Sequence, residues 1–509
     1  MNYWRLLDLA APEAILVVAV LAVLLTDLTA LRGMDLRLRL RIGALVAGAG
    51  CLAALGWLLL MPGASNPLDA MLVVDPLTRL VKAGILVLAL FAVLLTLDSD
   101  FTNHVGEYYA VLLLATVGMM LLASSSDLLM IFLSLELASL SLYVLTAFNK
   151  SSVAATEAAL KYFLFGGVAA AFTLFGLSLL YGIAGSTSLA DVARVAGERA
   201  ILVVTSDSGV TTRSIDPLLI AAIVMTVVGF GFKVAVVPFH LWAPDTYQGA
   251  PIPAAAFIAS GSKLASFFVF AKVMLIGFAG AEGSGAWLAM RPGWVAVMAI
   301  LAAASMLWGN LAAIAQRRVR RLLAYSAIAH SGYMLLAVMT HGPEAMASLL
   351  YYAFTYGLTA LGAFAVVSVV QGPSSDECLA DFAGLSRRAP VISLCMLVFL
   401  LSLAGIPPLA GFFGKFYLFS AALRGGALLS QNLWLVILAI GMSTVSLYYY
   451  LQVLKQIFIV EPTPSPSSQP VPVATQTLLV VLAAAVVVLG GAPGLLLHPL
   501  LNALTQAGW

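Results

Sequence analysis

Charged residues are scarce in this chain. Asp, Glu, Lys and Arg together make up 9% of its 509 residues, whereas a soluble globular domain carries roughly a quarter. Too few polar side chains remain to cover a water-facing surface, so the composition excludes a soluble enzyme. The net charge is only +2, so the chain lacks the large positive charge with which proteins bind phosphate backbones. We therefore expect no nucleic-acid partner.

Cysteine and cofactor motifs are missing as well. The three cysteines, Cys51, Cys378 and Cys395, form no CxxC motif and no Cys/His cluster, which excludes an iron–sulfur cluster or a structural zinc site within the chain. Neither a GxGxxG turn after a strand nor a GxxxxGK[ST] loop occurs, and these are the motifs that hold dinucleotides and nucleotide phosphates. We therefore expect no flavin, nucleotide, cluster or metal in this chain.

Hydrophobic residues, by contrast, make up 62% of the chain. Continuous apolar runs bounded by Pro, Gly and charge predict an all-α polytopic membrane protein with about fourteen transmembrane helices. The first run is longer than a signal-peptide core and ends in charge, so it predicts a permanent span. The predicted spans are residues 11–30, 42–61, 75–97, 107–123, 127–148, 154–182, 217–239, 253–279, 293–315, 321–340, 344–370, 389–424, 432–458 and 476–497.

Two of these spans are predicted to be broken helices. Span 217–239 contains Pro238 shortly after two glycines, and span 389–424 would be about 54 Å long if straight but contains the sequence Gly-Ile-Pro-Pro at 405–408. Proline removes a helix hydrogen bond, and transporters place broken helices at ion sites; packing kinks are the alternative. The Pro- and Ser-rich stretch 461–473 predicts an extended spacer that releases the last helix from the body.

The distribution of positive charge tests the number of spans. Alternate connections, starting with the first, contain twelve positive residues, whereas the opposite side contains six, three of them in the long sixth connection, 183–216. Short positive connections stay in the cytoplasm, so we expect both termini outside, in the periplasm of a bacterial inner membrane. The twelve are Arg32, Arg37, Arg39, Arg41, Lys150, Arg317, Arg318, Arg320, Arg321, Arg387, Arg388 and Lys455.

Several charged residues fall inside the predicted spans. A lysine or aspartate at the centre of a membrane helix costs about 2.5–3.5 kcal/mol on insertion scales unless it faces a partner or a wet cavity. Moving a carboxylate toward or away from a buried lysine changes how firmly the lysine holds its proton, which is what a proton relay requires. Structural ion pairs are the alternative. The candidate relay residues are Glu136, Lys161, Lys233, Lys263 and Lys415.

Two histidines are further candidates for proton transfer. His240 follows Pro238 at the end of span 217–239, and His330 lies in the middle of span 321–340. Histidine titrates near neutral pH and suits proton transfer, but a membrane histidine can equally be a hydrogen-bonding residue without that role.

For other charges a structural explanation is the expectation. Glu157 precedes Lys161 by four residues, so the two form an i,i+4 pair on one helix face. Lys272 lies near the outer end of its span, and Arg79 and Lys82 lie in the first turns of another. Long cationic side chains at such positions can snorkel to the membrane surface.

The stretch GFKVAVVPFHLWAPDTYQGAP, residues 231–251, makes the family recognisable. It resembles the antiporter-like membrane subunits of bacterial proton-translocating NADH:quinone oxidoreductase, respiratory complex I, and among them the N type. The resemblance covers essentially the whole chain, including LELASLSLYVL, EAALKYFLFGG, LAYSAIAHSGY and LAGIPPLAGFFGKF. The motif HLWAPDTYQGAP and the lysine at position 415 resemble the N type. The L and M types typically carry HxWLPDAH, and the M type carries a glutamate at the position that matches 415.

The resemblance implies two inverted five-helix repeats. Glu136, Lys161, Lys233, Lys263 and Lys415 would line a central polar axis, with His240 and His330 at polar positions on it. The expected division is residues 1–106 for the first three helices, 107–280 and 290–460 for the repeats, 461–475 for the linker and 476–509 for the last helix.

The resemblance also implies partners. These would be the lipid bilayer and the M, L, K, J, A and H types of complex I membrane subunit, while FMN, iron–sulfur clusters and quinone would lie in other subunits. A subunit of a multi-subunit cation/proton antiporter remains an alternative, because such subunits share the helix breaks and lysines. A purely structural membrane spacer is a second alternative, in which replacing the central lysines by methionine is harmless.

Overall fold

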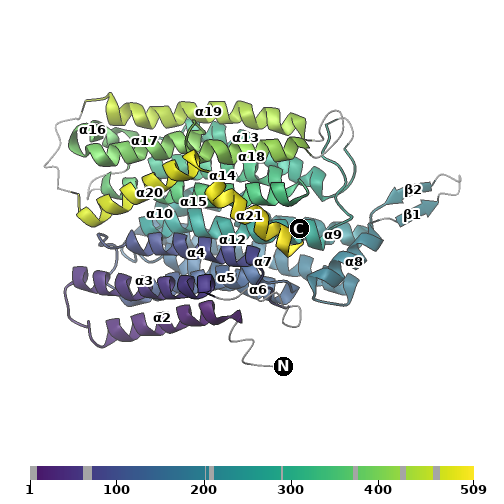
Figure 1. Cartoon of the computed structure of the whole chain (residues 1–509), viewed down its shortest axis with the longest axis horizontal. Helices are drawn as coiled ribbons and strands as arrows, with labels where there is room; N and C mark the ends of the chain where they lie inside the picture. Colours follow the sequence, from purple (N-terminus) through teal and green to yellow (C-terminus); the bar gives the residue numbers. More distant parts are fainter. Residues whose placement is uncertain are drawn as a thin grey trace.

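The computed structural model describes residues 9–60, 71–200, 202–205, 211–287, 290–370, 377–424, 432–461 and 471–508. Long helices run side by side along the length of the molecule (Figure 1). They are α2 (Ala11–Leu28), α3 (Leu36–Leu60), α4 (Pro76–Leu94), α5 (Val105–Ser124), α6 (Leu128–Thr146), α7 (Val153–Ala184), α9 (Pro217–Lys233), α13 (Trp294–Ile314), α14 (Val319–Val338), α15 (Pro343–Val370), α17 (Pro390–Ala404), α18 (Ala410–Arg424), α19 (Leu433–Phe458) and α20 (Val473–Gly491).

One further span combines four helical segments of different geometry. They are α11 (Ile252–Phe257), the π-helix η1 (Ile258–Ser262), α12 (Lys263–Lys272) and the π-helix η2 (Val273–Gly277). This span is wholly buried inside the chain. Single π-turns interrupt the regular ladder of backbone hydrogen bonds and are frequent at functional sites. Here they border α12 on both sides, at Lys263 and at Lys272.

Local sequence accounts for where many helices begin. Asp75, Asp127 and Asp216 each accept a hydrogen bond from a backbone N–H of the first turn of the helix that follows, which satisfies a donor that has no partner within the helix. Proline stands at the first position of α4, α9 and α17, where its missing N–H costs nothing. The predicted helix starts are therefore close to the observed ones.

Helices lie at the predicted apolar runs, with ends that differ from the predicted ones by up to six residues. Eleven helices among the described residues are long and apolar enough to cross a membrane. Both predicted breaks are present. Helix α9 ends at Lys233, and an irregular segment follows before the short helix α10 (Trp242–Gly249). Residues 405–409 separate α17 from α18, and Gly405 has a φ of 88°, a backbone conformation that favours glycine.

The connection between α7 and α9 is more ordered than the sequence indicated. It contains the amphipathic helix α8 (Leu189–Arg199) and a hairpin of β1 (Leu202–Thr205) and β2 (Thr211–Ser214), paired antiparallel with Leu202 opposite Ser214. The hairpin extends beyond one end of the helix bundle (Figure 1). It is a small exception to an otherwise helical fold.

The expectation that a spacer releases the last helix from the body is wrong. Residues 462–470 of that spacer lie outside the described residues, but α20 packs against α15, α17 and α18. The hydroxyl of Tyr351 donates to the carbonyl of Leu489, at 2.7 Å. A short helix that the sequence did not predict, α21 (Gly494–Ala507), then packs against α15 and α4. Buried apolar residues of α20 such as Leu479 and Val486 explain why it stays attached.

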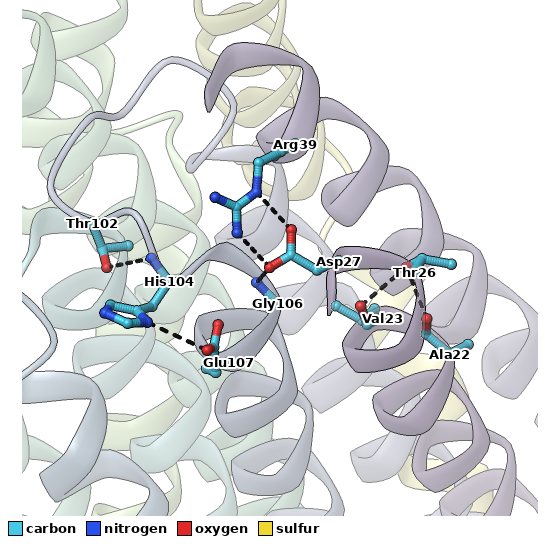
Figure 2. A network of polar contacts seen from close by, with 9 residues as sticks. All are labelled: Ala22, Val23, Thr26, Asp27, Arg39, Thr102, His104, Gly106 and Glu107. Atoms are coloured by element: carbon cyan, nitrogen blue, oxygen red, sulfur yellow. Dashed lines mark hydrogen bonds and ion pairs between the residues drawn. The ribbon is translucent and has the colours of Figure 1, made fainter. Parts of the chain in front are cut away.

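The connections between helices gather at two ends of the bundle. We call end A the end that holds residues 29–35, 95–104, 147–152, 240–251, 315–318, 377–389 and 459–461. Asp27 accepts two hydrogen bonds from Arg39, at 2.8 and 2.7 Å, and one from the backbone N–H of Gly106, at 3.0 Å, which ties the first connection to the third (Figure 2). Arg320 donates to the carbonyl of Ala250, at 2.8 Å.

End B holds the intervening connections, of which the structure describes residues 71–75, 125–127, 185–200, 202–205, 211–216, 278–287, 290–293 and 339–342. The backbone N–H of Val73 donates to Ser124, at 2.7 Å, and that of Leu128 donates to Thr187, at 2.8 Å. The indole of Trp434 donates to the carbonyl of Gly285, at 2.9 Å. Each of these contacts joins connections that the alternation of spans assigns to the same side.

Candidate functional site: a row of buried amines

The site begins where α9 ends. Lys233 is the last residue of α9 and is buried, with 9% of its surface exposed. Its ammonium donates a hydrogen bond to Ser139 of α6 and lies 5.4 Å from the centre of the Tyr143 ring. Glu136, one turn before Ser139, interacts electrostatically with Lys233. One oxygen of the Glu136 carboxylate is buried and has no hydrogen-bond partner in the described part of the chain.

Lys263 lies at the next position, at the border between η1 and α12. It is buried, with 2% exposed, and its ammonium donates to the carbonyl of Ala327, at 2.5 Å, and to the hydroxyl of Ser331, at 2.8 Å. The hydroxyl of Ser331 in turn donates to the carbonyl of Val234, at 2.6 Å. Ser331 therefore connects Lys263 directly to the backbone that follows Lys233.

His330, next to Ser331 on α14, continues the row. Its Nδ1 lies 2.6 Å from the hydroxyl of Tyr352 and its Nε2 lies 3.3 Å from the hydroxyl of Tyr450. The ring interacts electrostatically with both Lys263 and Lys415. His330 is 2% exposed, and it occupies the position between the two lysines.

Lys415 ends the row beside the second helix break. Its ammonium donates to the last two carbonyls of α17, those of Leu403 at 2.9 Å and Ala404 at 3.0 Å, and to the hydroxyl of Ser443 at 2.8 Å. The ammonium also lies 5.2 Å from the centre of the Tyr333 ring. The carboxyl end of a helix carries partial negative charge, so the break between α17 and α18 creates the acceptor that a buried cation needs.

The two breaks thus serve the same physical purpose in different ways. At the first break, the end of α9 brings Lys233 to its carboxylate partner. At the second, the end of α17 supplies backbone carbonyls to Lys415. Only Glu136 contributes an acidic side chain to the row within the described residues, so the other amines are held by hydroxyl, phenol and carbonyl groups. Such groups can orient an ammonium without fixing its charge by an opposite one.

Lys161 and His240 lie apart from this row. Lys161 is 40% exposed and forms ion pairs with Glu157, at 2.7 Å, and Asp245 of α10, at 2.8 Å, so the expected i,i+4 pair is present. His240 is buried in the turn after the first break, with its ring centre 6.4 Å from that of Trp308. No hydrogen bond among the described residues joins either side chain to the row.

The sequence shows Asp245 as part of the family motif but does not indicate which residues it contacts. It also accepts a hydrogen bond from Arg321 of α14, at 2.6 Å, so it connects α7, α10 and α14 at end A. Burial raises the pKa of the Asp245 carboxyl, but the hydrogen bonds from Lys161 and Arg321 outweigh burial and hold this pKa below its ordinary value.

The expectation that Lys272 snorkels to the surface is wrong. It is 6% exposed, and its ammonium donates to the carbonyl of Ser125 and to the hydroxyl of Ser126, both at 2.8 Å. The expectation for Lys82 is wrong for a similar reason. Lys82 is 1% exposed and forms an ion pair with Glu13 of α2, at 2.7 Å. Both side chains find acceptors inside the protein, so they need not reach the surface.

The hydroxyl groups that hold the row could not be selected from the sequence. Ser139 lies one helical turn after Glu136, and Ser331 directly follows His330. This closeness to a candidate residue is the only feature of the sequence that points to them. Tyr333, Tyr352 and Tyr450 belong to a chain with 16 tyrosines, and no spacing distinguishes these three.

These features define a class of protein: a polytopic helical membrane protein with a row of buried amines between two broken helices. The model of the NADH:quinone oxidoreductase/Mrp antiporter transmembrane family matches residues 125–445, well over half of the chain. The chain belongs to this family. Among the described residues, no group of three or more His, Cys, Asp or Glu side chains could hold a metal ion.

Individual relatives agree with this assignment. NADH-quinone oxidoreductase subunit N 2 of Acidobacterium capsulatum is 49% identical over 506 residues, covering 98% of this chain and 99% of that protein. The F(420)H(2) dehydrogenase subunit N of Methanosarcina mazei is 37% identical over 427 residues, covering 82% and 81%.

Solved structures show the same fold. A chain of the respiratory complex I from Thermus thermophilus with bound aureothin is 34% identical, with a TM-score of 0.76, and the match covers 96% of this chain and 98% of that one. A chain of the Mrp complex from Dietzia is 21% identical, with a TM-score of 0.78 and coverage of 99% and 97%. At this lower identity the likeness shows the fold alone.

Proposed function

We propose that this chain is the N-type, antiporter-like subunit of a proton-translocating NADH:quinone oxidoreductase. It carries protons along the row formed by Glu136, Lys233, Lys263, His330 and Lys415. The observation that supports this most directly is the arrangement of the row: Glu136 interacts electrostatically with Lys233, His330 interacts with both Lys263 and Lys415, and Ser331 joins Lys263 to the backbone carbonyl of the residue after Lys233. Redox chemistry occurs in partner subunits that hold FMN, iron–sulfur clusters and quinone.

The chemistry of the row suits proton transfer. A buried ionisable group in a membrane protein is costly and is usually retained for a pathway. The ammonium of Lys233 has one carboxylate partner, Glu136, and a shift of that carboxylate would change how strongly Lys233 holds its proton. A conformational signal from a neighbouring subunit that moves Glu136 would therefore release a proton into the row. Lys161 and His240 lie nearer to end A and would act in proton entry.

The contacts between connections support fourteen membrane crossings. Eleven spans qualify by length and hydropathy, and α9, α14 and the α17–α18 pair supply three more. Alternation of these fourteen places the connections at ends A and B as observed, with end A in the cytoplasm and both termini outside. The two inverted repeats, 107–280 and 290–460, each contain one broken helix, α9 in the first and α17–α18 in the second.

The assembled complex supplies the partners. Other membrane subunits of complex I, of the M, L, K, J, A and H types, assemble with the chain in a bacterial inner membrane. Helix α7 offers a suitable surface, because Leu160, Leu164, Phe165 and Val168 are exposed on it beside the charged pair of Glu157 and Lys161. Exposed apolar surface of this kind faces either lipid or another subunit.

The test is NADH-driven proton uptake by vesicles that contain the purified complex. Lys233→Met and Glu136→Gln keep side-chain size but remove the charge, and both should assemble normally while proton uptake and coupled quinone reduction fall strongly. Lys150→Met is the matched control, because it removes an exposed lysine in the connection between α6 and α7. Normal proton uptake in both charge-removing variants would refute the proposal, and uptake driven by a sodium gradient without NADH would favour a cation/proton antiporter.

A further inference from the structure

Lys272 is a buried lysine that the row from Glu136 to Lys415 does not use. It is the last residue of α12, nine positions after Lys263, and η2 begins directly after it. Its place is close to end B, where the connections 71–75, 125–127 and 185–189 meet. A buried lysine within a membrane span is costly wherever it lies, so its retention at this position requires a reason.

The groups around the ammonium reach the surface at end B. Lys272 donates to the carbonyl of Ser125 and the hydroxyl of Ser126, both at 2.8 Å, and Ser126 is partly exposed. Lys272 also interacts electrostatically with Asp75, which is partly exposed at the start of α4. The nearby Asp127 is buried, and its carboxylate accepts hydrogen bonds from two backbone N–H groups of α6. Asp75 is therefore an acidic group that both interacts with Lys272 and is open to solvent.

A small cavity lies beside Lys233, on the face of α12 nearer to the start of that helix. It has a volume of about 10 Å³ and is lined by Lys233 and Ser139 together with Ser262 and Ser266 on the face of the α11–α12 span. A cavity of this size is near the minimum that holds one water molecule, which also needs polar partners. The hydroxyls of Ser262 and Ser266 have no hydrogen-bond partner within the described residues and are available to such a water.

Two chain segments connect the lining of this cavity to the surroundings of Lys272. On α5 the cavity is lined by Met119 and Leu122, and Ser126 follows four residues after Leu122, just past the end of α5 at Ser124. On α12, Lys272 follows the lining residue Ala265 by seven residues, so the two lie on the same helix face about 10 Å apart along the axis. The side chain of a helical residue leans toward the amino end of its helix, so that of Lys272 leans back toward Ala265 and shortens this gap.

We propose that Lys272 is a proton-relay residue that connects the space beside Lys233 to solvent at end B through Asp75. This proposal rests on the proposed function. The ammonium of Lys272 first gives a proton to the carboxylate of Asp75, and the new O–H bond breaks when bulk water accepts the proton. The neutral amine of Lys272 then takes a proton, through water, from the ammonium of Lys233, so one N–H bond breaks and another forms. Lys233 takes up the next proton from the entry side at end A, and every group regains its starting charge.

The competing role is a purely structural one, in which Lys272 only pins Ser125 and Ser126. Two variants separate the roles. Lys272→Gln keeps N–H donors but carries no exchangeable positive charge, and Lys272→Arg keeps donors and charge but cannot release its proton. As a relay, Lys272 cannot be replaced by either, so both should show a severalfold loss of NADH-driven proton uptake by vesicles of the complete complex. Normal uptake in both would overturn the proposal.

Asp75→Asn is the partner variant. Asparagine caps a helix as well as aspartate does, so it preserves the hydrogen bond from Thr78 to residue 75 but removes the acid. We expect a severalfold loss of proton uptake here too, with normal assembly on a native gel. If Lys233→Met abolishes uptake while Asp75→Asn and both Lys272 variants pump normally, the relay through Lys272 is wrong and the proposed function still stands.

A measurement of accessibility keeps the proposal testable even where a variant assembles poorly. In Lys272→Cys, a small membrane-impermeant thiol reagent added at end B should label the new cysteine in intact complex. The wild-type chain sets the background, because its own Cys51 and Cys395 are buried and the partly exposed Cys378 lies at end A, away from the reagent. No labelling above that background would mean that water does not reach this position, and the proposal would fail.

Discussion

Replacing Ser331 by alanine tests whether proton transfer depends on the hydroxyl that joins Lys263 to the backbone beside Lys233. The hydroxyl of Ser331 accepts a hydrogen bond from Lys263, at 2.8 Å, and donates one to the carbonyl of Val234, at 2.6 Å. Ser331 is completely buried. Ser331→Ala removes both bonds, together with the longer contact of the hydroxyl with the carbonyl of Ala327 in its own helix, at 3.0 Å; it removes almost no volume and leaves every charged residue in place.

The size of the effect follows from the two bonds. A hydrogen bond to a charged group contributes about 1.5–3 kcal/mol, and one between neutral groups contributes about 0.5–1.5 kcal/mol. Their loss disfavours the aligned arrangement of Lys263 and Val234 by about 2–4 kcal/mol, and each 1.4 kcal/mol corresponds to about tenfold in a rate or an equilibrium. We therefore expect NADH-driven proton uptake to fall by about tenfold or more while the complex still assembles.

The control is Ser348→Ala on α15. Ser348 is also buried, but its hydroxyl donates only to the carbonyl of Glu344 in its own helix, at 2.6 Å. Proton uptake by vesicles of each variant complex, normalised to the amount of assembled complex, is the assay. Equal uptake in Ser331→Ala, Ser348→Ala and wild type would refute the reasoning, because the hydroxyl would then carry no part of the path.

Three further predictions concern stability. A Cβ on Gly490 would lie 2.2 Å from a backbone oxygen of the second helix break, whereas a Cβ on Gly491 would meet nothing within 4 Å. Gly490→Ala should therefore destabilise the packing of α20 by about 1–3 kcal/mol, as judged by thermal unfolding. Gly491→Ala, the control, should not destabilise it. Glu13→Gln leaves the buried ammonium of Lys82 without its charge partner and should cost about 3–5 kcal/mol, whereas replacing both residues by leucine and methionine should be far milder, as judged by the yield of assembled complex. The folded-state pKa of Asp245 is lowered. Its ion pairs therefore add stability above the usual carboxylate pKa of about 3.9, and this stability is lost as pH falls through the folded-state pKa. Asp245→Asn should remove this acid-sensitive contribution to stability, as judged by unfolding measurements at a series of pH values.

Each of these has a clear contrary result. Equal unfolding temperatures for the two glycine variants would mean that α20 does not pack closely against the break. A double replacement at residues 13 and 82 that assembles as poorly as the single one would mean that the side chains matter for shape and not for charge. An unchanged acid profile in Asp245→Asn would mean that the ion pairs of Asp245 contribute no measurable stability.

Hydropathy and proline predict most of the fold, because a lipid environment forces nearly every backbone polar group into a helix. The spans and both breaks therefore appear in the sequence as apolar runs and as Pro238 and Pro407. Helix α8 and the hairpin after it were not predicted, since they lie in a polar connection where this constraint is absent. The packing of α20 against the bundle was not predicted, because a proline-rich linker does not indicate which helices the segment after it contacts.

The charged members of the row could be chosen from the sequence because charge inside a span is rare. Their partners could not. The hydrogen bonds of Lys263 reach α14, 64 and 68 residues further along the chain, and such distant contacts leave no local pattern. Position along a span also misled the prediction for Lys272, because closeness to a helix end suggests access to the membrane surface only when no inner acceptor is available.

The arrangement of neutral partners around Lys263 and Lys415 has a consequence for how protons move. Both ammonium groups interact electrostatically with His330, and neither has a carboxylate partner among the described residues. Like charges in a medium of low dielectric constant repel strongly, so a positive charge on one of the three groups makes a charge on its neighbours less favourable. Among the amines of the row, within the described residues, only Lys233 has a counter-charge, that of Glu136. If protons move along the row as proposed, a proton that enters at Lys233 and passes to Lys263 would favour release from Lys415, and this transfer would need no large movement of the helices that hold the row.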